Sequence, residues 1–449
     1  MSATLKKLAN AVFAHAHAKS CNAALCHIAH PHRPESPLIS TACASPSQLA
    51  DCPWFRRRLR YNVRPPCPRR VRGAGQILPN KQGRSVTPST DSNVNKFLDS
   101  MELPGIGHVI GEVGKVLSVD SQGGRLRARI ELGFPAESAH GEFASHVASL
   151  LAPETGLHDI VVEFSTKISS HAVQPNVKAR PGIRNIIAVA SGKGGVGKST
   201  VAANLALSLA AEGARVGVLD ADIYGPSQPQ MLGLSGKTPD SEDGKTMVPL
   251  EGHGLQVMSI GFLIEPDQPM VWRGPMVTSA LQQLLGQTNW NDLDYLVVDM
   301  PPGTGDIQLT LSQQVPVSGA VIVTTPQNIA TLDARKGLAM FRKVSIPVLG
   351  VIENMSTHVC SNCGHEEPIF GSGGGQQMAR DFDVTLLGQM PLDARIRERT
   401  DGGMPTVVSE PDSRAAAAFR RAALRLSAEL ATRDKDYSSK FPNIVVEER

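Results

Sequence analysis

A glycine-rich loop with two lysines has the residue types and the spacing that bind phosphate. It fits the pattern G-x-x-x-x-G-K-[ST] and reads Gly192-Lys193-Gly194-Gly195-Val196-Gly197-Lys198-Ser199. Glycines let successive backbone N–H groups point at phosphate oxygens, and the following helix N-terminus adds a positive dipole end. The loop therefore predicts a nucleotide site in which Lys198 reaches the β- and γ-phosphates and Ser199 gives its hydroxyl to Mg²⁺.

Acidic residues at two later strand ends extend the predicted nucleotide site. Val297-Val298-Asp299 is an apolar strand ending in an acid, an arrangement that helps to hold Mg²⁺. Asp222 follows another strand, where it would orient the attacking water or the metal; a helix N-cap is the alternative. The loop Pro301–Asp306 is in place to sense the γ-phosphate.

Two cysteines, Cys360 and Cys363, form a C-x-x-C element. A [4Fe–4S] cluster or a tetrahedral zinc site normally takes four ligands, so one pair supplies half a set, and two chains would supply a whole one. Three alternatives stay open: zinc bound with His365 or His358, a redox-active dithiol, and cysteines without a ligand.

The elements that must position these residues alternate between strand and helix. Continuous apolar runs are typical of a parallel sheet with helices on both faces, so we expect an α/β fold, a doubly wound parallel sheet preceded by a small α+β domain. In that domain Val113–Val119 and Leu126–Leu132 predict a hairpin across Asp120–Gly124. A helix over Glu137–Leu151 should bury Phe143, Val147 and Leu150, and a strand over Asp159–Phe164 should follow. In the sheet domain we expect strands at Ile186–Ala190, Arg215–Leu219, Leu255–Ile260, Tyr295–Val298, Ala320–Thr324, Val348–Ile352 and near Leu386, a helix to about Ala211, and a last helix over Ser413–Thr432.

The predicted segments are a disordered basic extension (1–92), the small domain (93–168), a linker (169–184), the nucleotide-binding domain (185–432) and a tail (433–449).

The balance of charge differs between the two parts of the chain. The whole chain carries 45 Lys and Arg against 42 Asp and Glu, but residues 1–85 hold 14 basic and only 2 acidic residues. The remainder, with 31 basic and 40 acidic residues, is net −9, which argues against a large nucleic-acid-binding surface. No run of about 18 uncharged apolar residues predicts a membrane span. Without an evident secretory signal we expect a reducing compartment; the Arg-rich N-terminus leaves a mitochondrial matrix protein with a transit peptide as one alternative.

Several motifs together resemble one family. Lys193 near the start of the loop resembles the deviant Walker A motif of the MinD/ParA/nitrogenase-iron-protein superfamily. Within it the chain resembles the Mrp/ApbC iron–sulfur carrier ATPases over about 185–432. The resemblance rests on Asp220–Ser227, Trp272–Met276, Asp299–Asp306, Glu353–Ser356, Cys360–His365 and Ile369–Gly371. The small domain resembles, more weakly, the MIP18-like domain of bacterial members, but lacks an Asp-Pro-rich motif near 98–108.

The resemblance implies a function and a set of site residues. It implies an ATP-hydrolysing carrier that binds a [4Fe–4S] cluster across a homodimer, receives it from a donor scaffold and passes it to apoproteins. Because the ATPase part and the cysteine element look most like those of bacterial members, the expected location is cytoplasmic. Lys193 would reach the nucleotide of the partner copy, and Asn354 would read the base edge, as its amide can. The expected catalytic residues are Lys193, Lys198, Asp222 and Asp299. The expected nucleotide-binding residues are Gly192, Lys193, Gly194, Gly195, Val196, Gly197, Lys198, Ser199, Thr200 and Asn354, with Ser199 and Asp299 on Mg²⁺ and Cys360 and Cys363 on the cluster.

Two other functions compete with the carrier. A MinD/ParA-like spatial organiser with a structural zinc site would need a membrane helix or a basic surface, whereas the chain ends in a short segment with Pro442 and acidic residues. A nitrogenase-iron-protein-like electron donor has its cluster cysteines far apart in sequence, unlike Cys360 and Cys363. We therefore expect neither nucleic acid nor membrane as a partner.

Overall fold

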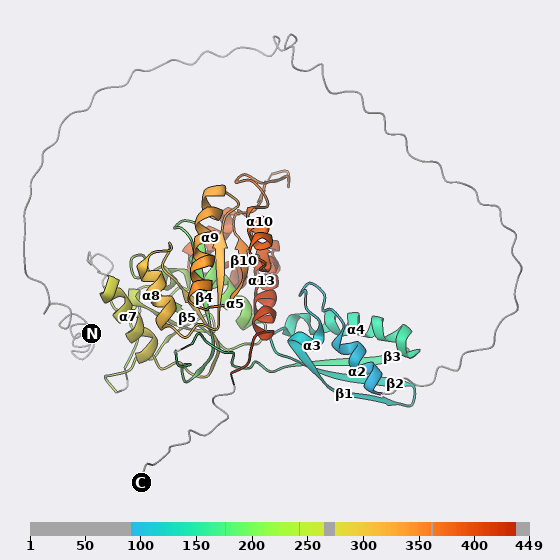
Figure 1. Ribbon diagram of the computed structural model, residues 1–449. Coiled ribbons are helices and arrows are strands. Elements are labelled where there is room, and N and C mark those ends of the chain that lie inside the picture. The colour runs from blue at the N-terminus through green and yellow to red at the C-terminus, as the bar shows by residue number, and fades with distance from the viewer. Residues whose placement is uncertain (1–90, 176, 242, 265–273, 361, 437–449) are drawn as a thin grey trace, which may run out of the picture. The chain divides into compact units, whose positions relative to one another are not determined.

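The computed structural model describes residues 91–436, apart from 176, 242, 265–273 and 361 (Figure 1). The expected disordered extension and most of the expected tail lie outside the described residues, as does part of the Trp272–Met276 motif. In the described part of the chain, no helix has the length and apolar character needed to cross a membrane.

A three-stranded sheet with order β1-β2-β3 forms the small α+β domain. Its elements are α2 (Asp91–Asp99), α3 (Ile110–Val113), β1 (Gly114–Gln122), β2 (Arg125–Leu132), α4 (His140–Thr155) and β3 (Asp159–Thr166), with a 3-10 turn at Glu137–Ala139. The hairpin turn is shorter than predicted, because only Gly123 and Gly124 lie between the strands, both at positive φ. Leu150 is exposed, contrary to prediction, and Leu151 is buried, because a step of four residues from Val147 continues the spacing that begins at Phe143.

Eight strands form the large sheet of the nucleotide-binding domain, in the order β13-β10-β9-β4-β8-β5-β7-β6. They span β4 (Ile183–Ser191), β5 (Val216–Asp220), β6 (Leu250–Gly252), β7 (Leu255–Ser259), β8 (Leu293–Asp299), β9 (Gly319–Thr324), β10 (Val348–Glu353) and β13 (Leu386–Gln389). All pairs are parallel except β6 with β7, so the prediction of a parallel sheet holds for seven strands and misses an antiparallel edge. The tight turn at His253 and Gly254 returns the chain alongside β7.

Helices cover both faces of this sheet (Figure 1). The two that contact each other on one face are α5 (Lys198–Ala211) and α13 (Arg414–Ala431); the other face carries α7 (Gly274–Gln287), α8 (Asp306–Gln314), α9 (Asn328–Lys343) and α10 (Gly374–Asp381). Short helices α6 (Gln228–Met231), α11 (Ala394–Asp401) and α12 (Thr406–Ser409) and a 3-10 turn (Ile260–Phe262) complete the domain. Val201, Leu205 and Leu209 of α5 are fully buried, as expected for the apolar face of a helix packed on a sheet.

The predicted linker is attached to the nucleotide-binding domain. Gln174 is buried, where its amide donates to the carbonyl oxygen of Ser312 and accepts from the backbone N–H of Val317. His171 pairs with Lys435 in an isolated β-bridge, so the start of the predicted tail is bound too. Because buried polar groups need partners, these contacts hold a segment that composition alone predicts to be free.

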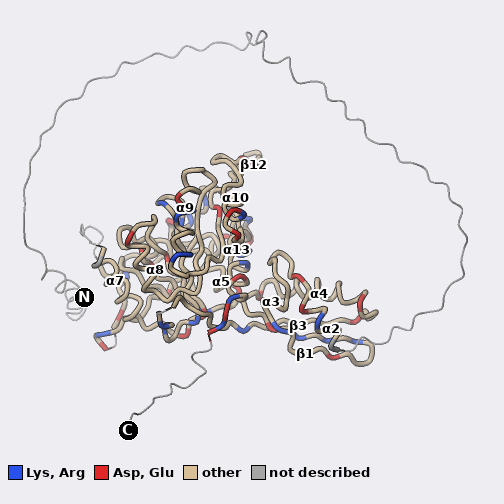
Figure 2. Tube along the Cα trace, in the orientation of Figure 1, with Lys and Arg blue, Asp and Glu red and all other residues tan. Residues whose placement is uncertain are grey.

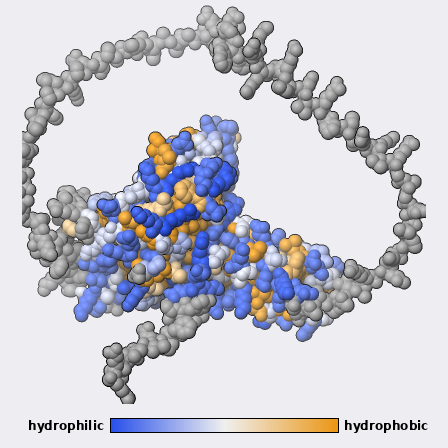
Figure 3. Space-filling model, in the orientation of Figure 1, coloured by the Kyte–Doolittle hydropathy of each residue, from blue (hydrophilic) through white to orange (hydrophobic). Residues whose placement is uncertain are grey.

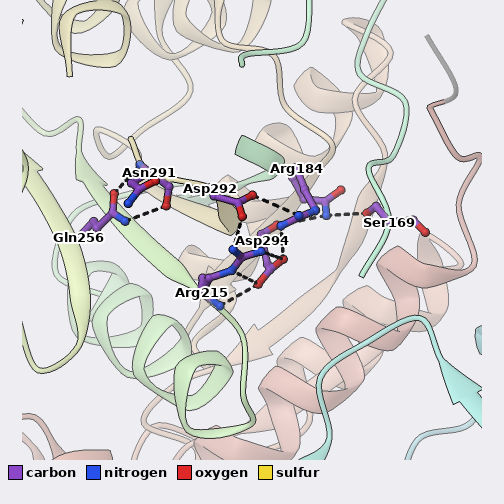
Figure 4. Close-up of polar contacts among 8 residues, drawn as sticks. Ser169, Arg184, Arg215, Gln256, Asn291, Asp292 and Asp294 are labelled. Atoms are coloured by element: carbon purple, nitrogen blue, oxygen red, sulfur yellow. Dashed lines mark hydrogen bonds and ion pairs between the residues drawn. The ribbon is translucent and has the colours of Figure 1, made fainter. Parts of the chain in front are cut away.

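Charged residues tie together the first residues of three parallel strands (Figure 4). The carboxylate of Asp294, almost buried in β8, accepts from Arg184 of β4 and from the backbone N–H of Arg215, which precedes β5. Asp292 lies beside both arginines but is exposed. This network is at the opposite end of the strands from the phosphate-binding loop, so it stabilises the sheet and not the site.

Lys and Arg are interspersed with Asp and Glu along the described chain (Figure 2). Hydrophilic residues cover most of the face shown in Figure 3, and the apolar residues visible there form separate patches. This distribution is in line with the mildly acidic, mixed charge that the sequence gives for residues after 85.

Candidate functional site

The phosphate-binding loop joins the end of β4 to the start of α5, in the middle of the sheet. Gly195 and Gly197 have φ values of 79° and 78°, which side-chain-bearing residues rarely adopt. A Cβ on Gly192 would lie 2.2 Å from the carbonyl carbon of Asp333 in α9. The chain leads from β4 to β5 on one side, whereas β9, the neighbour of β4 on the other side, leads on to β10 in the opposite direction. Ligands of open α/β sheets bind at such a switch point.

Lys198 is buried at the floor of this loop and is surrounded by oxygen atoms. Its ammonium binds the carboxylate of Asp299, lies 3.3 Å from the hydroxyl of Ser199 and is 3.9 Å from the nearer carboxylate oxygen of Asp222. Asp299 is fully buried, so the ammonium supplies the charge that a buried carboxylate needs. The structure therefore brings together four residues that the sequence placed at separate strand and helix ends.

The hydroxyl of Ser199 and the carboxylate of Asp299 suit a magnesium ion. Both are hard oxygen ligands of the kind that Mg²⁺ prefers, and a cation already lies between them as the ammonium of Lys198. Bound Mg²⁺ would neutralise charge that develops on the phosphates. Asp222 is close enough to contact a hydrated ion or a water, and burial raises its pKa although Lys198 opposes this.

Two residues beneath the loop, Asp220 and Gln228, were not predicted as site residues. Asp220 is buried and accepts from the backbone N–H of Gln228 and from the hydroxyl of Ser259. Burial, together with the charge of Asp299, raises the pKa of Asp220 to about 7. Gln228 donates from its amide to Asp299, at 2.9 Å. Asp220 belongs to a motif noted in the sequence, but nothing in the sequence indicated Gln228.

A cavity of about 260 Å³ opens above these side chains. Among its walls are Lys193, Gly194, Gly195, Gly197, Lys198, Ser199, Thr200, Asp222 and Pro302. Most of the predicted phosphate-binding residues therefore face one space. Lys193 is part of the wall and makes no ion pair within the described residues, so its predicted reach to a partner's nucleotide stays a prediction.

Asn354 lies against the phosphate-binding loop. Its side-chain amide donates to the carbonyl oxygen of Val196 at 2.9 Å, and its backbone N–H donates to Thr324. A Cβ on Gly197 would come within 2.3 Å of this amide nitrogen, so a larger residue there would displace the Asn354 side chain. The contact ties the end of β10 to the loop, and the predicted base-reading role of Asn354 stays a prediction.

The cysteine pair sits at the tip of a small hairpin that follows β10. Strands β11 (His358–Val359) and β12 (Glu366–Glu367) flank it, and the backbone N–H of Cys360 donates to His365. Neither cysteine forms a disulfide, and Cys363 is exposed. Hydrogen bonds from the backbone N–H groups of Cys363 and then Asn362 lower the pKa of the Cys360 thiol, which favours the thiolate that binds metals.

A third ligand for zinc does not join the pair within the described residues. No group of three His, Cys, Asp or Glu side chains there could hold a metal ion. The Nδ1 atom of His358, one of the two candidate zinc ligands, is 3.0 Å from the carbonyl oxygen of Leu392. The described chain thus presents two thiols side by side, which is half of a four-ligand set.

Comparison with known proteins decides the family. Residues 182–427 match the family model described as ParA: NUBPL iron-transfer P-loop NTPase. The chain belongs to this family of iron-transfer P-loop NTPases. It is 49% identical to the iron-sulfur cluster carrier protein of Escherichia coli K12 over 78% of this chain and 95% of that one. It is also 53% identical to the mouse iron-sulfur cluster transfer protein NUBPL, over 57% and 80% of the two chains.

Two solved structures are similar to about half of this chain. A nucleotide-binding protein of Archaeoglobus fulgidus in complex with ADP is 37% identical over 52% of this chain and 90% of that chain, with a TM-score of 0.45. The cell division ATPase MinD of Pyrococcus furiosus is 23% identical over 55% and 98% of the two chains, with a TM-score of 0.40. Membership of the family confirms the prediction of an iron–sulfur carrier that is a P-loop NTPase of the ParA type.

Proposed function

We propose that this family member carries a [4Fe–4S] cluster between two copies of itself and releases it to apoproteins under the control of ATP. Cys360 and Cys363 of each copy supply the four thiolates. ATP and Mg²⁺ bind at the phosphate-binding loop, with Lys193 crossing to the partner's nucleotide. We further propose that the protein works in the cytoplasm, receives its cluster from a donor scaffold and passes it to apo iron–sulfur proteins.

The single observation that carries the proposal is the exposed hairpin with two free thiols on a nucleotide-binding domain of this family. Exposure suits cargo, because a cluster that is handed on must be reached by the thiolates of a client. Transfer is then an exchange of ligands. Each iron–sulfur bond to Cys360 or Cys363 is replaced by a bond to a client thiolate, and the iron atoms keep their oxidation states.

A short run of the chain links the nucleotide site to the hairpin. Asn354 contacts the phosphate-binding loop, and the buried carboxylate of Glu353 accepts from Gln389 and from the hydroxyl of Ser356. Cys360 follows Asn354 by six residues. A shift of the loop on nucleotide binding would therefore act on residues that set the position of the cysteines, which supports control of transfer by ATP.

The test measures iron, sulfide and the visible spectrum of the full chain after anaerobic reconstitution. We expect about four irons and four sulfides per dimer, with a broad absorption near 400 nm. Cys360→Ala and Cys363→Ala should each lose this cluster and the transfer of it to an apoprotein, whereas Cys67→Ala, far away in sequence, should keep both.

Two outcomes would overturn the proposal. Full transfer by both Cys360→Ala and Cys363→Ala would show that these thiols do not hold the cargo. About one zinc per chain with no chromophore would instead favour a structural zinc site and the spatial-organiser function.

A further inference from the structure

Gln228 is a fully buried amide beneath the phosphate-binding loop. Its Nε2 group donates to the carboxylate oxygen Oδ2 of Asp299 at 2.9 Å and to the backbone carbonyl of Ser199 at 3.1 Å. Its backbone N–H donates to Asp220 at 3.1 Å. One residue thus contacts the end of β8, the first turn of α5 and the end of β5.

The two carboxylate oxygens of Asp299 have different partners. Lys198 binds its Oδ1 atom and Gln228 binds its Oδ2 atom. When a nucleotide binds, the ammonium of Lys198 is expected to turn to the phosphates. Gln228 is then the remaining side chain of the described residues that holds Asp299, and its hydrogen bond to Oδ2 restricts the rotation of the carboxylate.

The oxygen atom of the Gln228 amide provides a second observation. The Oε1 atom of Gln228 is buried and has no hydrogen-bond partner in the described structure. An unpaired buried acceptor is costly, and such groups in native proteins usually serve a purpose or take up a water. A water on a metal ion is a strong donor, and this acceptor belongs to the side chain that contacts the carboxylate of Asp299 and the backbone of Ser199.

We propose that Gln228 is a positioning residue that orients Asp299 for the magnesium ion of the bound nucleotide. The inference rests on the proposed nucleotide site. It makes no use of the cysteines, so it is independent of the cluster. Its consequence is specific: Gln228 should matter for the gain in nucleotide affinity that Mg²⁺ provides, and not for affinity in the absence of Mg²⁺.

The test is the affinity of the full chain for ADP and for a non-hydrolysable ATP analogue, with Mg²⁺ and with EDTA. Gln228→Met keeps the length of the side chain and removes the amide. We expect the Mg²⁺-dependent gain to fall about tenfold, as for a hydrogen bond to a charged group, and the affinity in EDTA to stay within about twofold. Gln230→Met, the same change at an exposed position of α6, should alter neither value.

A second variant keeps the test decisive if Gln228→Met does not fold. Gln228→Asn retains the amide but is one methylene shorter, so it cannot span Asp299 and Ser199, and the same loss is expected. An unchanged Mg²⁺-dependent gain in a folded variant would overturn the inference, as would an equal loss of affinity with and without Mg²⁺. Absence of nucleotide binding in the wild-type protein would instead refute the proposed nucleotide site.

Discussion

The substitution Gly192→Ala tests how tightly the phosphate-binding loop packs on α9. An added Cβ would lie 2.2 Å from the carbonyl carbon of Asp333 and 2.4 Å from the backbone nitrogen of Ala334. These are backbone atoms of a helix, which cannot turn aside as a flexible side chain can. The loop or the helix must therefore shift, and extra atoms in a well-packed region typically cost 1–3 kcal/mol. We expect Gly192→Ala to lower the free energy of unfolding by about 2 kcal/mol.

Gly194→Ala is the matched control in the same loop. No atom lies within 4 Å of a Cβ built at Gly194, and its φ is not in the left-handed region. Alanine there should leave the free energy of unfolding unchanged or raise it by about 0.5 kcal/mol, because it restricts the unfolded chain.

Urea unfolding of the nucleotide-free protein, followed by circular dichroism, measures both variants. The comparison uses the transition midpoint and its slope, since a change in slope would signal a loss of two-state behaviour. If Gly192→Ala were as stable as Gly194→Ala, the close approach of α9 to the loop would be wrong. A loss of ADP affinity in Gly192→Ala should accompany the loss of stability, because the shifted loop no longer presents its N–H groups to phosphate.

Three further predictions concern other parts of the molecule. Asp294→Ala should lower the free energy of unfolding in urea titrations by about 1–2 kcal/mol, because Arg184 and the N–H of Arg215 lose their acceptor. The control Asp292→Ala, at an exposed position, should lower it by less than about 0.5 kcal/mol. Equal losses in the two variants would contradict the stabilising role of the network. Burial lowers the pKa of His171, so the unfolded chain binds more protons and stability falls as pH drops below about 6.5. His171→Gln should flatten the decline in melting temperature between pH 7.5 and pH 5.5, whereas the control His158→Gln should not. Equal slopes in the wild-type protein and in both variants would refute this prediction. Finally, we expect no ATP-dependent co-sedimentation with lipid vesicles or DNA; co-sedimentation with either would revive the spatial-organiser function.

Local patterns predicted most of the large sheet. The apolar runs at Ile186–Ala190 and Tyr295–Val298 lie within β4 and β8, and the last helix begins one residue after the predicted Ser413, which caps it by accepting from Ala416. Such elements could be predicted because burial on both faces of a parallel strand leaves a continuous apolar run. The antiparallel strand β6 was missed because three residues are too few to show a period.

The sequence by itself determined the chemistry of the site. The order of glycines, lysines and Ser199, the acid at the end of β8 and the paired cysteines are local features, because each depends on the spacing of a few neighbouring residues. They identified the nucleotide loop and the family that the comparisons then confirmed.

Only the tertiary structure decided which of these residues meet. Lys198 contacts Asp299 from 101 residues away, and Gln228 joins Asp299 across 71. Contacts of this kind depend on the order of strands in the sheet, where β8 lies between β4 and β5 although it follows both in the chain. No local pattern encodes that order, and for this reason the role of Gln228 emerges from the fold alone.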